Sequence, residues 1–123
     1  MTELLQDDNE HPIPLELRPT FQRIAEAFAD GDFSLASHKI ESVDPVTGNV
    51  AQHISDCIGA YGDRLVGLNP ATWERSCYRH DGDHWIGLID LTTAREAVSD
   101  LTLHVRINLD PDLRIQIESV HVA

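Results

Sequence analysis

Residues 101–109 alternate strictly between apolar and polar side chains, and this stretch constrains the fold more than any other. The apolar positions are Leu101, Leu103, Val105, Ile107 and Leu109, and the polar positions are Thr102, His104, Arg106 and Asn108. A period of two over nine residues is typical of a β-strand with one face buried. We therefore expect a strand whose apolar side chains enter the core and whose polar side chains face water.

Three further strands are expected around this one. The run that includes Gly87 and Asp90 is otherwise apolar on both faces, which indicates a central position in the sheet. Asp110-Pro111-Asp112 has the chemistry of a turn, and the phase of the alternation flips near Ser119, which indicates a β-bulge. The predicted strands cover residues 72–80, 85–91, 101–109 and 113–122.

Two helices are expected before the strands. Residues 15–30 carry an apolar stripe and end at Asp30-Gly31, and residues 50–65 follow a good helix cap at Asn49. The predicted fold class is α+β, with two N-terminal helices packed on a four-stranded antiparallel meander. Residues 1–12 are predicted to be a flexible acidic tail and residues 13–123 a single α+β domain.

The net charge of −12 restricts the partners that the chain can have. It argues against nucleic acid and against anionic membrane surfaces, and it favours a basic protein partner. Cys57 and Cys77 form no disulfide framework, and the N-terminus shows no signal peptide. We expect a cytoplasmic monomer or homodimer without a cofactor.

Three groups of side chains are candidates for chemistry. Cys77, His80 and His84 have spacings not far from those of zinc ligands, but a solvated turn explains them better and no metal is predicted. Asp90 lies inside an apolar strand, and either a catalytic acid or a structural carboxylate bonded to backbone or to an arginine such as Arg95 would explain it. His121 could join Asp90 and Asp100 in a dyad, although a structural role as a buried polar residue is favoured for Asp90 and His121.

The polar side of the last two strands is the candidate binding surface. Such a face is often only the hydrated side of an antiparallel sheet. Its functional interpretation is a flat, hydrogen-bonding surface for a protein. The residues of this tentative site are Thr102, His104, Arg106, Asn108, Arg114, Gln116 and Glu118. We expect a protein that is not an enzyme and that binds another protein through an acidic and polar surface, as immunity proteins and antitoxins do.

The C-terminal half resembles a family of small bacterial α+β domains that have no assigned function. The resemblance lies in Trp85, in the segments Leu-Ile-Asp-Leu-Thr (88–92) and Ser-Asp-Leu-Thr-Leu (99–103), and in the ending Ile-Glu-Ser-Val-His-Val (117–122). Thr92 and Ala97 depart from the family pattern, where tryptophan and glycine are usual. The resemblance implies a fold and a bacterial source, and it implies no mechanism.

A looser likeness connects the chain with the cone-shaped nuclear-transport-factor-like fold. Its basis is a helix that ends in Ala-Phe-Ala-Asp-Gly-Asp (27–32), followed by long strands late in the chain. This likeness implies an apolar pocket for a small ligand, with Asp90 and His121 as its polar groups. Small-ligand binding or hydrolysis in such a pocket is the alternative function.

Overall fold

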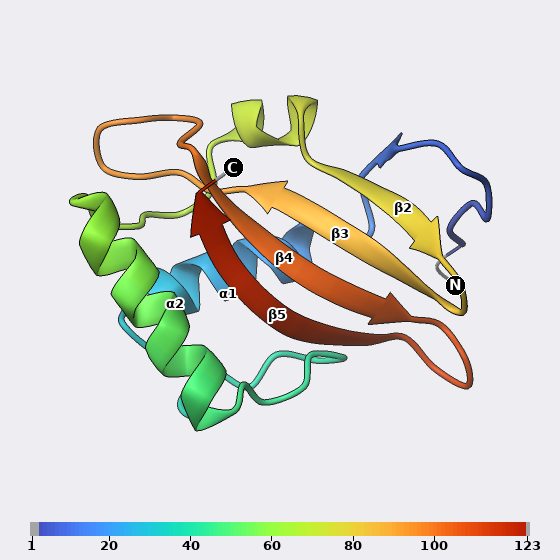
Figure 1. Ribbon diagram of the computed structural model, residues 1–123, viewed down its shortest axis with the longest axis horizontal. Helices are drawn as coiled ribbons and strands as arrows, with labels where there is room; N and C mark the ends of the chain where they lie inside the picture. Colours follow the sequence, from blue (N-terminus) through green and yellow to red (C-terminus); the bar gives the residue numbers. More distant parts are fainter. Residues whose placement is uncertain (1–2, 123) are drawn as a thin grey trace.

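The computed structural model of the chain describes residues 3–122. Five antiparallel strands form one sheet in the order β1-β2-β3-β4-β5, with two α-helices and one 3-10 helix, η1 (Figure 1). The elements are β1 (His11–Pro12), α1 (Arg18–Ala29), α2 (Gly48–Tyr61), η1 (Pro70–Glu74), β2 (Cys77–Asp81), β3 (His84–Asp90), β4 (Leu101–Asn108) and β5 (Arg114–Val122). Neither α-helix has the length and apolar content that crossing a membrane requires within this part of the chain.

The prediction of a four-stranded sheet was wrong, because a fifth strand lies at its edge. His11 pairs with Tyr78 and Pro12 pairs with Cys77, so β1 adds two residues to the free side of β2. A two-residue strand has no periodicity that sequence reasoning could detect, and proline is tolerated only at such an edge. The broader α+β class is correct.

Residues 3–10, called here the N-terminal segment, lie against the sheet. The backbone N–H of Leu5 donates to the Tyr78 hydroxyl at 3.0 Å, and the indole N–H of Trp85 donates to the Leu5 carbonyl at 2.9 Å. Leu4 is buried in the core. Residues 1 and 2 of the predicted tail, and residue 123 of the predicted domain, lie outside the described residues. The flexibility of the tail stays a prediction.

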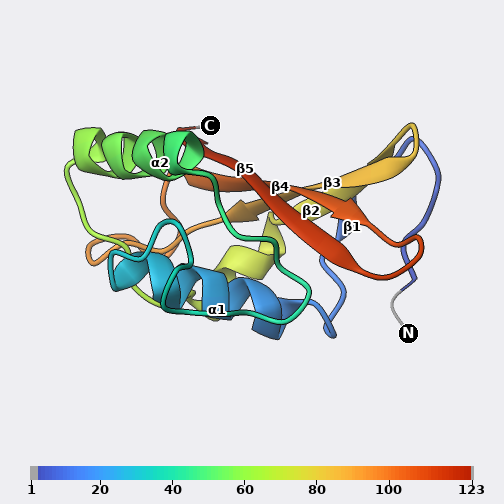
Figure 2. The same ribbon diagram turned by 90° about the horizontal axis from the view of Figure 1, so that it is seen from below.

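Helix α1 packs beneath the sheet. Pro19 lies in its first turn, where its missing N–H costs no helical hydrogen bond, and Gly31 follows its end in the left-handed conformation at φ 82°. Phe21, Ile24 and Phe28 form the buried stripe that the sequence predicts. Figure 2 shows α1 below the sheet, with α2 beside the C-terminal part of β5.

Helix α2 packs against β5, at the edge of the sheet. The Thr47 hydroxyl, and not Asn49, caps its first turn. The helix ends at Tyr61, four residues before the predicted Leu65, and Gly62 caps it. Ile54 and Ile58 are the buried residues of α2. The two helices therefore cover different parts of the sheet, one its inner face and the other its edge.

The inner face of the sheet forms cross-strand rows. Trp85 is paired with Ile107, and Ile107 with Ile115. Gly87 is the centre of the next row, where a Cβ atom would lie only 2.8 Å from Cγ2 of Val105. The glycine therefore lets β3 and β4 share one densely packed layer.

The connection between the helices has no helix or strand of its own, and Asp32 organises its first half. The Asp32 carboxylate accepts the backbone N–H groups of Ala36, Ser37 and His38, and it also contacts the His38 ring at 2.8 Å. These bonds, the His38 contact first among them, lower the Asp32 pKa to about 2. The second half of the connection pairs with β5 through a parallel bridge between Val43 and Ile115.

Candidate functional site

The outer face of the sheet is the candidate site. Figure 1 shows strands β2 to β4 with α1 behind them and no helix in front. The outer positions on β3 are Ile86, Leu88 and Asp90, because the alternate positions Trp85, Gly87 and Ile89 are buried in the core. This surface, called here the open face, is polar along β4 and β5 and apolar at its centre.

The structure brings the predicted binding residues together on two neighbouring strands. Arg106 is opposite Gln116, and Asn108 is opposite Arg114. Glu118 is the extra residue of a bulge in β5, since His104 pairs with Ser119 while the next residue, Val105, pairs with Ile117. The bulge that the sequence indicates near Ser119 is therefore confirmed within one residue. Of the seven predicted residues, Thr102 alone is buried.

An apolar centre lies beside these residues on β3. Ile86 and Leu88 are half-buried although no helix lies over them. Ile86 is paired with Arg79 on one side and Arg106 on the other, and Leu88 is paired with Cys77 and His104. Two aliphatic side chains enclosed by cationic and polar neighbours have the arrangement of a small protein interface, with an apolar centre and a polar rim.

Two histidines meet on the open face. The ring centroids of His104 and His121 are 6.0 Å apart in an edge-to-face orientation. Burial lowers the pKa of His104, and a charge on His121 lowers it further. Both effects favour the neutral form of His104.

Asp90 lies at the end of the open face and pairs with an arginine. Its carboxylate is 3.3 Å from Nε of Arg75, and not near the predicted Arg95, which pairs with Asp63 at 3.4 Å. Burial raises the pKa of Asp90, and the charge of Arg75 partly opposes this shift. The side chain lines a hollow of about 310 Å³, whose other residues are Arg75, Ser99, Asp100 and Thr102.

The structure does not bring Asp90 and His121 into direct pairing. Thr102 of β4 is paired with Asp90 on one side and with His121 on the other. The two predicted dyad residues are thus separated by one strand. His121 instead has its Nδ1 at 3.4 Å from the Ser119 hydroxyl.

Cys77 lies on the open face as a protonated thiol. Burial raises its pKa to about 11, and the charge of Glu10 adds to the shift. A thiol with so high a pKa supplies little thiolate at neutral pH, so Cys77 is a poor nucleophile and a poor metal ligand. His80 projects from the opposite face of β2, and residues 3–122 contain no cluster of three or more histidine, cysteine or carboxylate side chains arranged for a metal.

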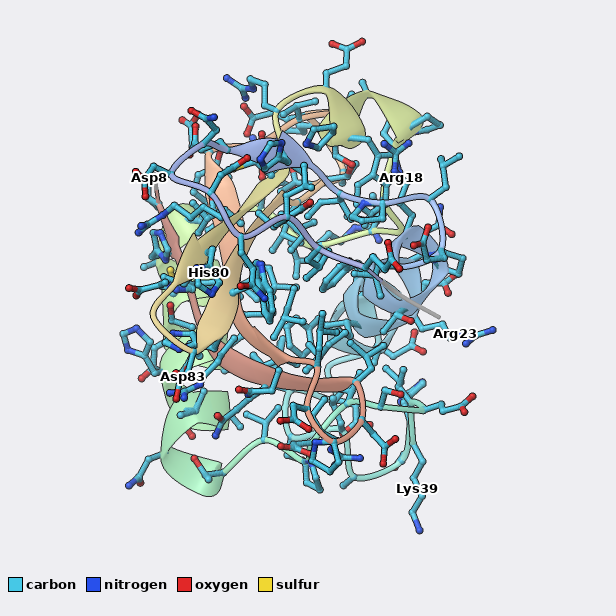
Figure 3. All side chains as sticks on the ribbon, turned by 90° about the vertical axis from the view of Figure 1, so that its right-hand side faces the viewer. Asp8, Arg18, Arg23, Lys39, His80 and Asp83 are labelled. Carbon is cyan, nitrogen blue, oxygen red and sulfur yellow. The ribbon has the colours of Figure 1, made fainter. Side chains whose placement is uncertain are left out.

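A hollow of about 550 Å³ lies at the hairpin end of the sheet, next to the open face. This hairpin-end hollow is enclosed by the N-terminal segment, the β2–β3 hairpin and the β4–β5 turn. Figure 3 looks at this end and labels His80 and Asp83 on the hairpin, away from the labelled cations Arg23 and Lys39. Its lining residues are Glu3, Leu4, Gln6, His80, Gly82, Asp83, Trp85, Asn108, Leu109 and Asp110.

Sequence reasoning found Asn108 but missed the rest of this hollow. Its residues come from three segments that are distant in the chain, and no motif connects them. One signal was present. The turns around Asp83 and Asp110 connect successive pairs of strands in a meander, so they must lie at the same end of the sheet.

Comparisons with known proteins place the chain in a family without giving it an activity. No curated protein and no solved structure matches the sequence. Residues 25–123 match the domain of unknown function DUF7668. Because this match covers most of the chain, the protein belongs to the DUF7668 family.

Proposed function

We propose that this protein binds another protein, of basic charge, and does not catalyse a reaction on it. The observation that carries the proposal is the open face, where Ile86 and Leu88 form an apolar centre without a covering helix. Arg79, Arg106 and His104 border this centre and supply hydrogen-bonding groups. Because two of them are cations, we expect the basic part of the partner to lie at the acidic hairpin end and a neutral or acidic part to lie on the open face. Stable interfaces combine such a centre with a polar rim.

The charge of the chain supports a basic partner. The net charge is −12, and Asp81, Asp83, Asp110 and Asp112 lie in the β2–β3 hairpin and the β4–β5 turn, at one end of the sheet (Figure 1). A field of this sign attracts a basic protein at long range and raises its association rate. Immunity proteins and antitoxins act by such capture, and we propose a cytoplasmic role of that kind in a bacterium.

A pull-down from a lysate of the source cell tests the proposal. We expect the tagged protein to retain a basic protein at low salt and to retain less of it at high salt. Replacing Ile86 and Leu88 together by serine should abolish retention. Leu15→Ser is the matched control, since Leu15 is 74% exposed outside the open face.

The comparison is valid only if the variants are as fully folded as the wild type. Circular dichroism should show that the Ile86/Leu88 double variant keeps the wild-type secondary structure at the temperature of the pull-down. If that folded variant retains the same partner as the wild type, the open face is not the binding surface and the proposal fails.

Small-ligand binding at Asp90 is a second candidate function. Asp90 has a raised pKa and lines the 310 Å³ hollow at the end of the open face. A desolvated carboxyl group in a hollow is a common feature of ligand and acid–base sites. A thermal-shift screen of small polar compounds tests this candidate. A compound that stabilises the wild type and not Asp90→Asn would support it, and a screen without such a compound would reject it.

A further inference from the structure

We propose that the open face is also a self-association surface, on which a second copy of the chain packs in a two-fold symmetric contact. This inference goes beyond the capture of a basic protein, because it assigns a second occupant to the same surface. The two occupants compete, so self-association lowers the amount of protein that can bind its partner. The distribution of charge over the chain and the order of the strands support the inference.

The open face is electrically neutral, although the chain as a whole is strongly acidic. Its outward positions on β2 to β5 hold three arginines and three carboxylates. These residues are Arg79, Arg106, Arg114, Asp81, Asp90 and Glu118. The chain has 9 lysines and arginines and 21 acidic residues in all, so its net charge of −12 comes from residues at other positions. Two copies can therefore meet on this face without an excess of like charge between them.

A second copy supplies the charges that this face needs. In a two-fold contact the same surface of both copies meets, so each group needs its complement on that one surface. Arg79 and Glu118 meet this condition, because neither takes part in an ion pair within residues 3–122. Both side chains are exposed, so each is accessible to a second copy.

The strand order allows two such ion pairs to form at once. On the open face, β3 and β4 lie between β2 and β5. A two-fold axis that runs along the strands, between β3 and β4, places β2 of each copy over β5 of the other. Arg79 is in the same cross-strand row as Ile86, Arg106 and Gln116, and Gln116 is two residues from Glu118. In this dimer each Arg79 lies near the Glu118 of the other copy.

The apolar centre of the open face lies next to that axis. Ile86 and Leu88 are on β3, and the axis places β4 of the second copy over them. Arg106 and His104 of that copy then face them, because these residues occupy the same cross-strand rows. The aliphatic stem of an arginine covers apolar side chains well, and the lowered pKa of His104, caused mainly by burial, favours its neutral ring. The contact therefore removes apolar surface from water.

The area of the face predicts a weak dimer. Strands lie about 4.8 Å apart and rise about 3.3 Å per residue, so β2 to β5 together present roughly 500 Å². Stable interfaces bury about 800 Å² on each partner. We therefore expect monomers and dimers in exchange, with dimers abundant only at high protein concentration.

Salt separates this contact from the capture of a basic partner. Two copies that each carry a net charge of −12 repel at long range. The Debye length is about 20 Å at about 25 mM salt and about 4 Å at about 500 mM, so added salt removes most of this repulsion, while ion pairs inside the contact are screened less. Self-association should therefore increase with salt, whereas binding of a basic protein should decrease.

Sedimentation equilibrium of the full chain at these two salt concentrations tests the inference. The protein is measured between about 50 µM and about 1 mM, the range in which small interfaces are occupied. We expect the apparent mass to rise from 13.7 kDa toward twice that value as the protein concentration increases, and to rise further at the higher salt. The NMR methyl signals of Ile86 and Leu88 should shift with protein concentration, while those of Leu15, which is exposed outside the open face, stay constant.

Charge reversal identifies the ion pair. Arg79→Glu places like charges opposite each other twice in the dimer, so it should weaken association about tenfold, and so should Glu118→Arg. The double variant restores both pairs and should associate as the wild type does. Lys39→Glu is the matched control, because it changes the net charge as Arg79→Glu does, while Figure 3 shows Lys39 pointing away from the strands. It should weaken association much less.

Three results would overturn this inference. They are a mass of 13.7 kDa at the highest protein concentration in both salts, a double variant no better than either single variant, and equal weakening by Lys39→Glu and Arg79→Glu. The pull-down measures capture separately, because it is carried out far below the concentration at which dimers form. A monomeric protein whose retention of a partner still depends on Ile86 and Leu88 would reject self-association and keep the capture of a basic protein. A dimer that retains no partner at either salt would do the reverse.

Discussion

Replacing Gly87 by alanine tests the packing of the sheet most directly. The new Cβ atom would lie 2.8 Å from Cγ2 of Val105, whereas carbon atoms pack at about 3.5–4.0 Å. Val105 is fully buried and β-branched, so its side chain cannot rotate away without leaving its preferred rotamer. Cδ1 of Ile89 and Cδ1 of Ile107 are also close, at 3.4 and 3.5 Å. The strands must therefore move apart by about 0.7 Å or more for ordinary contact.

The magnitude follows from two opposing effects. Overpacking a dense core costs about 1–3 kcal/mol. The lower entropy of the unfolded alanine chain offsets roughly 0.4–1 kcal/mol of that cost. We expect a net loss of about 1–2 kcal/mol in the free energy of unfolding. For a chain of this length the unfolding entropy is about 0.26 kcal/mol/K, so the Tm should fall by about 4–8 °C.

Urea denaturation and thermal melts followed by circular dichroism measure this loss. Gly59→Ala is the control, since Gly59 lies in α2 with no atom within 4 Å of its added Cβ, and there alanine should stabilise by up to about 1 kcal/mol. Combining Gly87→Ala with Val105→Ala removes the contacted methyl group, so the two losses should not add. A Gly87→Ala variant as stable as the wild type, or strict additivity with Val105→Ala, would refute the packing argument.

Three further predictions concern single contacts. The rate at which Cys77 reacts with iodoacetamide, followed by mass spectrometry, should rise with pH with a midpoint near 11, and Glu10→Gln should lower that midpoint. Asp32 is the main cause of the raised pKa of His38, so an NMR titration of Asp32→Asn should show that pKa falling toward 6.5. In the wild type, the protonated His38 ring stabilises the fold fully below pH 6.5, and this stabilisation is lost as the pH rises through the raised pKa. Tyr78→Phe removes the hydroxyl that accepts the Leu5 N–H, so the free energy of unfolding in urea should fall by about 1 kcal/mol. Hydrogen exchange in the N-terminal segment should become faster, and unchanged exchange would contradict this contact.

The long strands could be predicted from the sequence because their burial is periodic. The alternation in residues 101–109 and the doubly apolar run before it correspond to β4 and to the central strand β3. The end of α1 was also predictable, because Gly31 adopts the left-handed conformation that local chemistry favours there. These signals depend on neighbours in the chain, so no tertiary contact is needed to recognise them.

The remaining elements depend on tertiary contacts or on competing local signals. Strand β1 exists because two residues pair with β2, and nothing local favours it. Asn69 and Pro70 begin a 3-10 helix where Thr72 and Trp73 suggested a strand, since the Asn69 side chain caps the turn at the Ala71 N–H. Local turn chemistry there prevails over strand propensity.

The candidate site also has a part that the sequence predicts and a part that it does not. The polar side of β4 and β5 was predictable, because alternation assigns each side chain to a face. The apolar centre formed by Ile86 and Leu88 was not, since an apolar run on both faces does not reveal which face stays uncovered. The hairpin-end hollow was missed because Glu3, Trp85 and Asp110 meet only in the folded chain.

The bridge between Val43 and Ile115 has a consequence for self-association. It places residues 42–44 along β5, where the Ile115 N–H donates to Ser42 and the Asp44 N–H donates to the Ile115 carbonyl. A strand from another molecule cannot use those hydrogen-bonding groups. The opposite edge carries only the two residues of β1, one of them a proline that has no N–H to donate. The covered part of each border, Ile115 on β5 and Cys77 and Tyr78 on β2, is therefore closed to a strand of another molecule, so an intermolecular strand could pair only with the remainder of each edge.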